Sequence, residues 1–225
     1  MKDNWRIAPH SKDLSFIPTP IVESYPLLIQ TVEYPELIAY LKYRGIGLNT
    51  IHRFGIRVGH KGDLAFPFTN IHGNVMGLVF RNVVDKTIRG LHLTDLEEEG
   101  FVFPSRAKKG AWFGLHLLNI TDWVIIVEGE IDAMRVYDLG WDSVVSPGGT
   151  GVSKQQAAAI YNKKIYIGFD SDEAGKTGAK RLAKLWKDKR VKIIDWSVVG
   201  AKDPGELENV GALAVAIMMA EDYHG

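Results

Sequence analysis

Two short apolar runs, each stopping abruptly at acidic residues, organise the second half of the chain. Residues 123–127 end at Glu128, and residues 165–169 end at Asp170 and Asp172. Short β-branched runs bounded by polar residues and glycine predict buried strands. Each run is followed by apolar residues at helical spacing, and alternating strands and helices indicate a parallel sheet. The pattern therefore predicts an α/β fold for this half.

The same alternation continues to the end of the chain. A glycine-rich turn over 147–151 lacks the Gly-Lys-Thr/Ser ending of a phosphate-binding loop, so we interpret it as a tight turn. The pattern predicts strands at 123–127, about 142–146, 164–169 and 191–196, and helices at about 130–139, 155–161, 173–187 and 206–221.

The first half has a different pattern. Residues 1–33 contain four prolines and predict an extended arm that is either loosely structured or wrapped on the body. Residues 34–54 are typical of two short helices, and 64–68, 75–80 and 87–93 predict antiparallel strands, the first two joined by a turn at Gly73. We therefore expect an arm over 1–33, a smaller α+β subdomain over 34–121 and a parallel-sheet domain over 122–225.

The absence of cysteine is the feature of the composition that most restricts the possible chemistry of this chain. The 225 residues include no cysteine, which excludes disulfides, thiolate nucleophiles and cysteine-ligated zinc. The formal net charge is zero, so overall charge does not indicate nucleic acid, although a basic face can be offset by an acidic one. No apolar run has the length of a signal peptide core or a membrane span, which predicts a cytoplasmic protein.

Acidic residues follow three of the predicted strands. Glu128 follows the first, Asp170 and Asp172 the third, and Asp203 the fourth, while Asp132 lies one helical turn after Glu128. The carboxyl ends of parallel strands meet at one edge of the sheet, where ligands bind. Carboxylate oxygens suit Mg²⁺ or Mn²⁺. The alternative for each single carboxylate is a helix N-cap, which fits Asp172 well.

A carboxylate cluster of this kind favours metal-assisted phosphoryl transfer. One ion lowers the pKa of an attacking hydroxyl, and a second stabilises the leaving group. Glu128 is either a metal ligand or a general base, and the local pattern leaves both possibilities open.

Several basic residues are candidates for phosphate binding. Lys176 lies nearest the acidic edge on the predicted helix 173–187, and Arg106, Lys108 and Lys109 form a basic run. Arg81 closes the predicted strand 75–80. Each also has a plainer interpretation as a solvated surface charge.

The motifs resemble a known family. Val127-Glu-Gly-Glu-Ile-Asp132 and Phe169-Asp-Ser-Asp-Glu-Ala-Gly175 resemble the TOPRIM domain of bacterial and phage DnaG-type primases, topoisomerases and related nucleases and maturases. Residues 40–55, 64–68, 73–81 and 109–115 resemble the smaller basic α+β subdomain that precedes TOPRIM in primases. Lys202-Asp-Pro-Gly-Glu-Leu207 is similar to the primase Asp-Pro-Asp segment, but Gly205 stands where many primases have a second Asp. Glu206 is the available substitute.

The resemblance implies a primase catalytic core that copies single-stranded DNA into short RNA primers from ribonucleoside triphosphates by two-metal nucleotidyl transfer with Mg²⁺ or Mn²⁺. Glu128, Asp170 and Asp172 would be catalytic and hold metal, with Asp132 and Asp203 supporting them. Arg81 and Lys109 would bind template or nucleotide phosphates, and we expect Lys108 and Lys176 to assist. The expected partners are the template, the nucleotides, and a replicative helicase or a separate template-recognition protein.

Two parts of the family are not expected in this chain. The chain has no cysteines with which to build a zinc ribbon. No segment of it resembles a helicase or a helicase-binding domain. Two alternative functions stay open: a TOPRIM nuclease or maturase that hydrolyses nucleic acid, and a non-catalytic replication-accessory module that binds it. A topoisomerase is disfavoured because the chain has no room for strand-passage domains.

Overall fold

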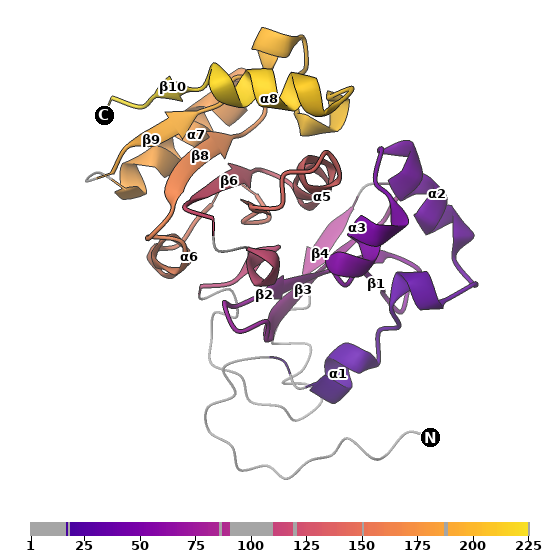
Figure 1. The fold of residues 1–225 in the computed structure, drawn as a ribbon. Helices are drawn as coiled ribbons and strands as arrows, with labels where there is room; N and C mark the ends of the chain where they lie inside the picture. The colour runs from indigo at the N-terminus through magenta and orange to yellow at the C-terminus, as the bar shows by residue number, and fades with distance from the viewer. Residues whose placement is uncertain are drawn as a thin grey trace, which may run out of the picture.

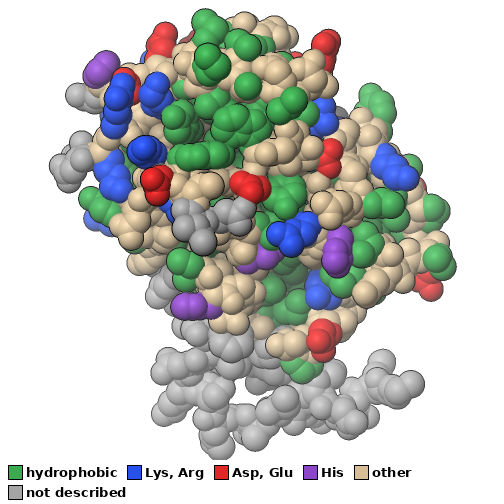
Figure 2. Space-filling view, viewed as in Figure 1, with side chains coloured by type: hydrophobic (Ala, Val, Ile, Leu, Met, Phe, Trp, Pro, Cys, Tyr) green, Lys and Arg blue, Asp and Glu red, His purple; other side chains and the backbone are tan. Residues whose placement is uncertain are grey.

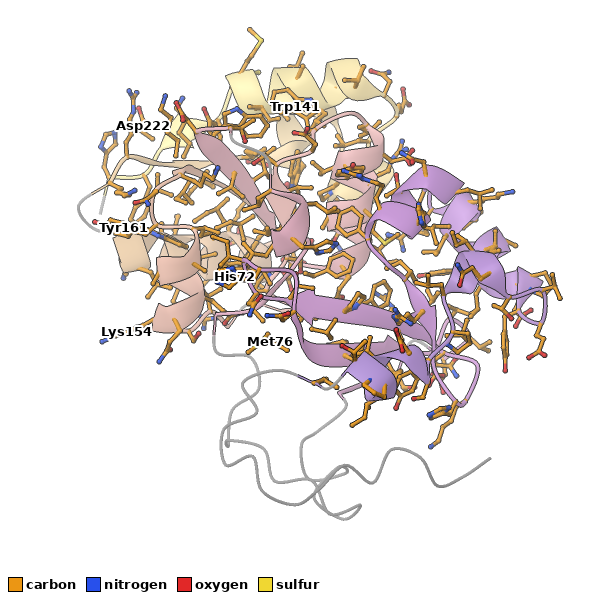
Figure 3. All side chains as sticks on the ribbon, turned by 60° about the horizontal axis from the view of Figure 1, so that its bottom comes forward. His72, Met76, Trp141, Lys154, Tyr161 and Asp222 are labelled. Atoms are coloured by element: carbon orange, nitrogen blue, oxygen red, sulfur yellow. The ribbon has the colours of Figure 1, made fainter. Side chains whose placement is uncertain are left out.

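The structure is a computed structural model that describes residues 17, 19–85, 87–90, 110–118, 121–149, 151–186 and 189–224. Within these ranges the chain forms two sheets. In Figure 1 the N-terminal half lies at the lower right and the C-terminal half at the upper left. In the turned view of Figure 3, His72 and Met76 mark the N-terminal sheet, and Tyr161 and Asp222 mark the far side of the C-terminal half.

The C-terminal sheet is parallel except at one edge. Its strand order is β10-β9-β8-β6-β7, and only β10 runs antiparallel to its neighbour. The predicted α/β class, a parallel central sheet flanked by helices, is confirmed. The strands are β6 (Trp123–Val127), β7 (Val144–Val145), β8 (Lys164–Gly168), β9 (Val191–Ile193) and β10 (Glu221–Asp222).

The two central strands pair along their whole length. β6 and β8 are in register from Trp123 opposite Lys164 to Val127 opposite Gly168. Val124, Ile125 and Ile126 are fully buried, as expected for a strand covered on both faces. Because both strands end at the same level, the residues that follow them emerge at one edge of the sheet.

Four α-helices connect and cover this sheet within the described ranges: α5 (Glu130–Asp138), α6 (Lys154–Ala159), α7 (Glu173–Ala183) and α8 (Val210–Met218). Their starts follow local side-chain chemistry. Ser153 and Gln156 form a reciprocal capping box at α6, and Asn209 accepts a hydrogen bond from the Ala212 amide at the start of α8. The last helix therefore begins at residue 210, later than the predicted 206.

The N-terminal half packs two helices, α2 (Pro35–Tyr43) and α3 (Leu48–Arg53), against an antiparallel sheet. The predicted helix pair and hairpin are both present. The strand order is β1-β2-β3-β4, and β5 pairs with the other end of β2. The strands are β1 (Arg57–Val58), β2 (Leu64–Thr69), β3 (Val75–Arg81), β4 (Ile88–Gly90) and β5 (Trp112–Phe113).

Three expectations differ from the structure. The described part of the predicted extended arm contains a short helix, α1 (Thr19–Glu23), with Val22, Tyr25 and Leu28 buried, because its apolar residues cover the N-terminal sheet. Strands β1, β5 and β10 were not predicted, since two-residue strands show no alternation. The predicted helix 173–187 ends its α-helical part at Ala183 and continues as a 3₁₀ turn over Lys184–Trp186.

The two halves share one hydrophobic core. Phe54 of α3 stacks on Phe113 of β5 at 4.8 Å between ring centroids, and both belong to the same buried cluster as Val127 and Met134. Phe113 also exchanges two backbone hydrogen bonds with Ser146, at 2.9 and 3.0 Å. The N-terminal sheet is thus joined to the end of β7 by backbone bonding as well as by apolar packing.

Helix α5 fixes the start of α3 through the side chain of Asp138. Asp138 Oδ1 accepts hydrogen bonds from the Gly47 amide at 2.8 Å and from Thr50 Oγ1 at 2.6 Å. Gly47 is the N-cap of α3 and has no side chain of its own to cap the helix. Asp138 therefore bonds the amide of the N-cap residue, as an N3 side chain does in a capping box, but it comes from the other half of the molecule.

Apolar side chains remain exposed in the C-terminal half. Val210, Met218 and Met219 on and after α8 are more than half exposed. Figure 2 shows hydrophobic side chains gathered over the upper half of this face. In the part of the chain that the structure describes, no helix is long and apolar enough to cross a membrane.

The shared cap gives a test of the contact between the halves. We expect Asp138→Ala to lower the free energy of unfolding by about 1–2 kcal/mol, because the Gly47 amide and the Thr50 hydroxyl then lose their acceptor. Urea unfolding followed by circular dichroism measures this change. Glu208→Ala, at an exposed position outside this contact, is the matched control. Equal stability of the two variants would contradict the capping role.

Candidate functional site

Five carboxylates gather at the carboxyl edge of the parallel sheet. Glu128 follows β6 directly, and Asp170 lies two residues beyond the end of β8. A hydrogen bond of 2.8 Å from the Ser171 amide to the Lys202 carbonyl brings the loop that carries Asp203 to the same edge. We call this set the carboxylate rim; its members are Glu128, Asp132, Asp170, Asp172 and Asp203.

Mutual repulsion shows that the members of the rim are close in space. Burial raises the pKa of Glu128, and the charges of Asp170 and Asp172 raise it further. The pKa of Asp170 is likewise raised, first by burial and then by Asp203, while Lys202 acts in the opposite direction. The rim therefore carries more negative charge than its basic neighbours neutralise.

Asp132 is the most strongly perturbed group of the rim. Burial, followed by the charges of Asp203 and Asp170, raises its pKa to about 7, against an opposing effect of Arg44. Its Oδ2 atom lies 2.7 Å from the point where a Cβ at position 129 would stand. Only glycine leaves room there, so Gly129 allows the first turn of α5 to bring Asp132 back to the rim.

Asp172 and Asp203 differ in their hydrogen bonding. Asp172 Oδ1 accepts a hydrogen bond of 2.9 Å from the Gly175 amide, so this residue is the N-cap of α7 while its charge still acts on Glu128. In the described part of the chain, Asp203 Oδ1 is shielded from solvent and has no hydrogen-bond partner. An unpartnered buried carboxylate oxygen is costly unless a cation or a donor completes it.

The structure does not join the predicted basic residues to the rim. Arg81 ends β3 and pairs with Leu64 at one end of β2. The opposite end of β2 carries Phe68, whose ring packs against Gly148 in the loop after β7. Lys176 lies 3.6 Å from Asp195, outside the rim. Lys108 and Lys109, together with Arg106, lie outside the described residues.

Sequence reasoning missed Arg44, which the fold brings to the rim. Its Nη2 atom lies 2.6 Å from the point where a Cβ at position 205 would stand, and Asp203 Oδ1 lies 2.9 Å from the same point. Arg44 falls within the predicted helix pair over 34–54 and the family-like segment 40–55, and no role at the rim was predicted for it. No local pattern links position 44 to position 205, because the two meet only through tertiary contact.

Glu206, the available substitute for a second Asp, is used within its own loop. Its Oε2 atom accepts a hydrogen bond of 2.7 Å from the Lys202 amide. Its charge is also the last of the effects that raise the pKa of Asp170. Glu206 therefore shapes the loop that carries Asp203 and adds to the negative charge near the rim.

The donors of the rim fit a divalent cation. Across the described residues no three His, Asp or Glu side chains converge tightly enough to form a ready-made metal cluster. Mg²⁺ nevertheless keeps several waters and uses only one or two protein carboxylates, so a sparse set of oxygens suffices. Glu128, Asp170 and Asp172 would hold such an ion, which would supply charge stabilisation and lower the pKa of an attacking hydroxyl.

Comparison with known proteins places this site in a described sequence family. A Toprim-like family model matches residues 125–207, which include every member of the rim. A DNA primase of Clostridium acetobutylicum is 26% identical over 188 residues, covering 77% of this chain and 30% of that protein. Uncharacterized protein MG010 of Mycoplasma genitalium is 32% identical over 157 residues, covering 67% of this chain and 68% of that protein.

The fold is shared with a solved structure. The crystal structure of the zinc-binding and RNA polymerase domains of the Aquifex aeolicus primase superposes with a TM-score of 0.71 at 22% identity. The superposition covers 91% of this chain and 60% of that one. The chain spans less than a third of the Clostridium acetobutylicum primase that it matches.

The raised pKa of Asp132 gives a pH-dependent stability. The folded state binds this proton more tightly than the unfolded chain, so the stabilisation is complete at low pH and is lost as the pH rises through about 7. Asp132→Asn keeps the shape of the side chain without the charge. We expect the variant to match the wild type only below about pH 4, where Asp132 is protonated in both the folded and the unfolded chain, and to be more stable near pH 8, by about 1–3 kcal/mol.

Urea unfolding in the presence of a chelator measures this difference without bound metal. Asp122→Asn, at an exposed position before β6, is the matched control and should show no such pH dependence. A variant at position 132 that is less stable than the wild type near pH 8 would contradict the assignment of repulsion to this carboxylate.

Proposed function

The chain belongs to the TOPRIM primases of the DnaG type, and on that premise we propose that it is a DNA primase catalytic core. In this proposal it is a nucleotidyltransferase that copies single-stranded DNA into short RNA primers from ribonucleoside triphosphates with Mg²⁺ or Mn²⁺. The observation that carries the proposal is the carboxylate rim at the carboxyl edge of β6 and β8, where burial and neighbouring carboxylates raise the pKa values of Glu128, Asp132 and Asp170. Such a site favours a cation and the phosphate groups that arrive with it.

The proposed roles follow from position. Glu128 and Asp170 lie at the ends of the paired central strands and hold the catalytic ion together with Asp172. Asp132 and Asp203 support them from α5 and from the neighbouring loop. Glu128 and Asp170 both have raised pKa values, and in this proposal the bound ion neutralises their charge in place of protons.

Basic residues would hold the nucleic acid. In this proposal Arg81, Lys108 and Lys109 contact template or nucleotide phosphates, and Lys176 exchanges Asp195 for a phosphate. Arg81 Nε is shielded from solvent and has no hydrogen-bond partner in the described part of the chain, so its hydrogen-bonding capacity is not met within that part. The smaller subdomain over 34–121 would thus carry template contacts, and the region 122–225 the chemistry.

A further partner would supply template choice. A replicative helicase, or a separate template-recognition protein, would deliver the single strand to the core. We propose such a partner because the chain contains no cysteine with which to build the zinc ribbon of the family.

Primer synthesis tests the proposed activity. The reaction contains a mixed set of single-stranded templates, the four ribonucleotides and Mg²⁺ or Mn²⁺, and its short products are resolved on a denaturing gel. We expect products whose yield falls by about a hundredfold or more in Asp170→Ala, because the ion loses a central ligand. Asp122→Ala should leave the yield unchanged. Absence of product with every template and both metals would contradict the proposal, and metal-dependent loss of template would indicate a nuclease.

Template binding tests the basic residues. We expect Arg81→Ala and Lys109→Ala each to weaken binding of single-stranded DNA and to reduce the slope of log affinity against log salt by about 0.7, because one phosphate contact is lost. Fluorescence anisotropy at several salt concentrations measures the slope. Lys180→Ala, exposed on α7, removes the same charge elsewhere. A slope that changes equally in all three variants would show only a general charge effect.

A further inference from the structure

Arg44 introduces a positive charge at one end of the carboxylate rim. It is the C-cap residue of α2, in the N-terminal half of the molecule. Its Nη2 atom and Asp203 Oδ1 lie 2.6 and 2.9 Å from one point, the Cβ position of a residue at 205. Its charge also acts on Asp132 and lowers the pKa of that carboxyl. The guanidinium therefore faces the Asp203 and Asp132 end of the rim.

One side chain of α5 holds this arrangement in place. Arg135 donates through Nη1 to the Gly45 carbonyl at 2.8 Å and through Nη2 to the Leu207 carbonyl at 2.6 Å. Gly45 follows Arg44, and Leu207 ends the loop that contains Asp203 and Gly205. Gly45 has a positive φ of 71°, and an added Cβ would lie 2.7 Å from Arg135 Nη1. The turn after α2 and the loop 203–207 are thus fixed to the same guanidinium.

Arg44 can occupy its position because residue 205 is glycine and has no side chain. Any side chain there would begin 2.6 Å from Arg44 Nη2, so either the guanidinium or the loop would have to move. An acidic side chain would pair with Arg44 at once. In the described part of the chain Asp203 Oδ1 has no hydrogen-bond partner, so this oxygen is not committed to another group.

We propose that Arg44 is a positioning residue that compensates the charge of the Asp203 and Asp132 end of the rim. In the free protein this end then binds no divalent ion of its own, and one ion binds at Glu128 and Asp170. A second ion would reach the site only with the phosphates of the nucleotide. The inference rests on the proposed metal-dependent function, but it concerns ion binding by the chain alone.

Electron paramagnetic resonance of Mn²⁺ counts ions without nucleotide or template. We expect one bound ion per chain in the wild type. Arg44→Ala should bind a second ion, or bind the first at least about tenfold more tightly, because a like charge next to the site is removed. Arg44→Lys should restore the wild-type titration. Lys42→Ala, which removes an exposed charge from the last turn of α2, is the matched control and should leave the titration unchanged.

A carboxylate at position 205 provides the converse test. Gly205→Asp alone should keep one bound ion, because the new carboxylate pairs with Arg44. The double variant Gly205→Asp with Arg44→Ala should bind two ions, more tightly than Arg44→Ala binds its second. Circular dichroism and thermal unfolding show whether each variant is folded before its titration is interpreted.

The outcomes separate this inference from the proposed activity. Two ions bound to the wild type, unchanged binding in Arg44→Ala, or a second ion in Gly205→Asp alone would each overturn it. A chain that makes no primers but shows the expected titrations would overturn only the proposed activity. A chain that makes primers but titrates identically in all variants would overturn only the role of Arg44.

Discussion

The in-register pairing of β6 with β8 is the constraint on which the candidate site depends. Five consecutive residue pairs fix the two strands at one level, so that Glu128 and Asp170 leave the sheet at the same edge. A slip of one residue would break this pairing and separate the levels at which Glu128 and Asp170 leave the sheet. The apolar burial of Val124 to Val127 therefore determines where the carboxylates lie, although no carboxylate takes part in that packing.

Helix α5 connects the carboxylate rim to the N-terminal half of the molecule. It begins beside Glu128, returns Asp132 to the rim in its first turn, and reaches the N-terminal half with Arg135 and Asp138. Those two side chains fix the turn after α2 and the start of α3. The same helix that belongs to the parallel-sheet half thus sets the position of Arg44, which comes from the other half.

The electrostatics of the rim are those of a site that is complete only with a cation. Carboxylates that raise one another's pKa, and an oxygen of Asp203 without a hydrogen-bond partner in the described part of the chain, cost folding free energy. Binding sites commonly hold such unfavourable arrangements because the ligand relieves them. Gly129 and Gly205 contribute to this arrangement because neither has a side chain. Asp132 occupies the space beside Gly129, and Arg44 occupies the space beside Gly205.

The sequence by itself determined the parallel strand pattern and the acidic residues that follow β6 and β8, because both are local: a β-branched run predicts a buried strand wherever it packs. The α/β class and the family motifs followed from these residues, while the roles of the individual carboxylates and basic residues stay predictions. Tertiary structure decided the rest. The burial of α1, the antiparallel edge strand β10, the pKa of Asp132 and the approach of Arg44 to Gly205 each require partners distant in sequence. Such contacts leave no periodic signal in the chain, because they depend on how the two halves pack.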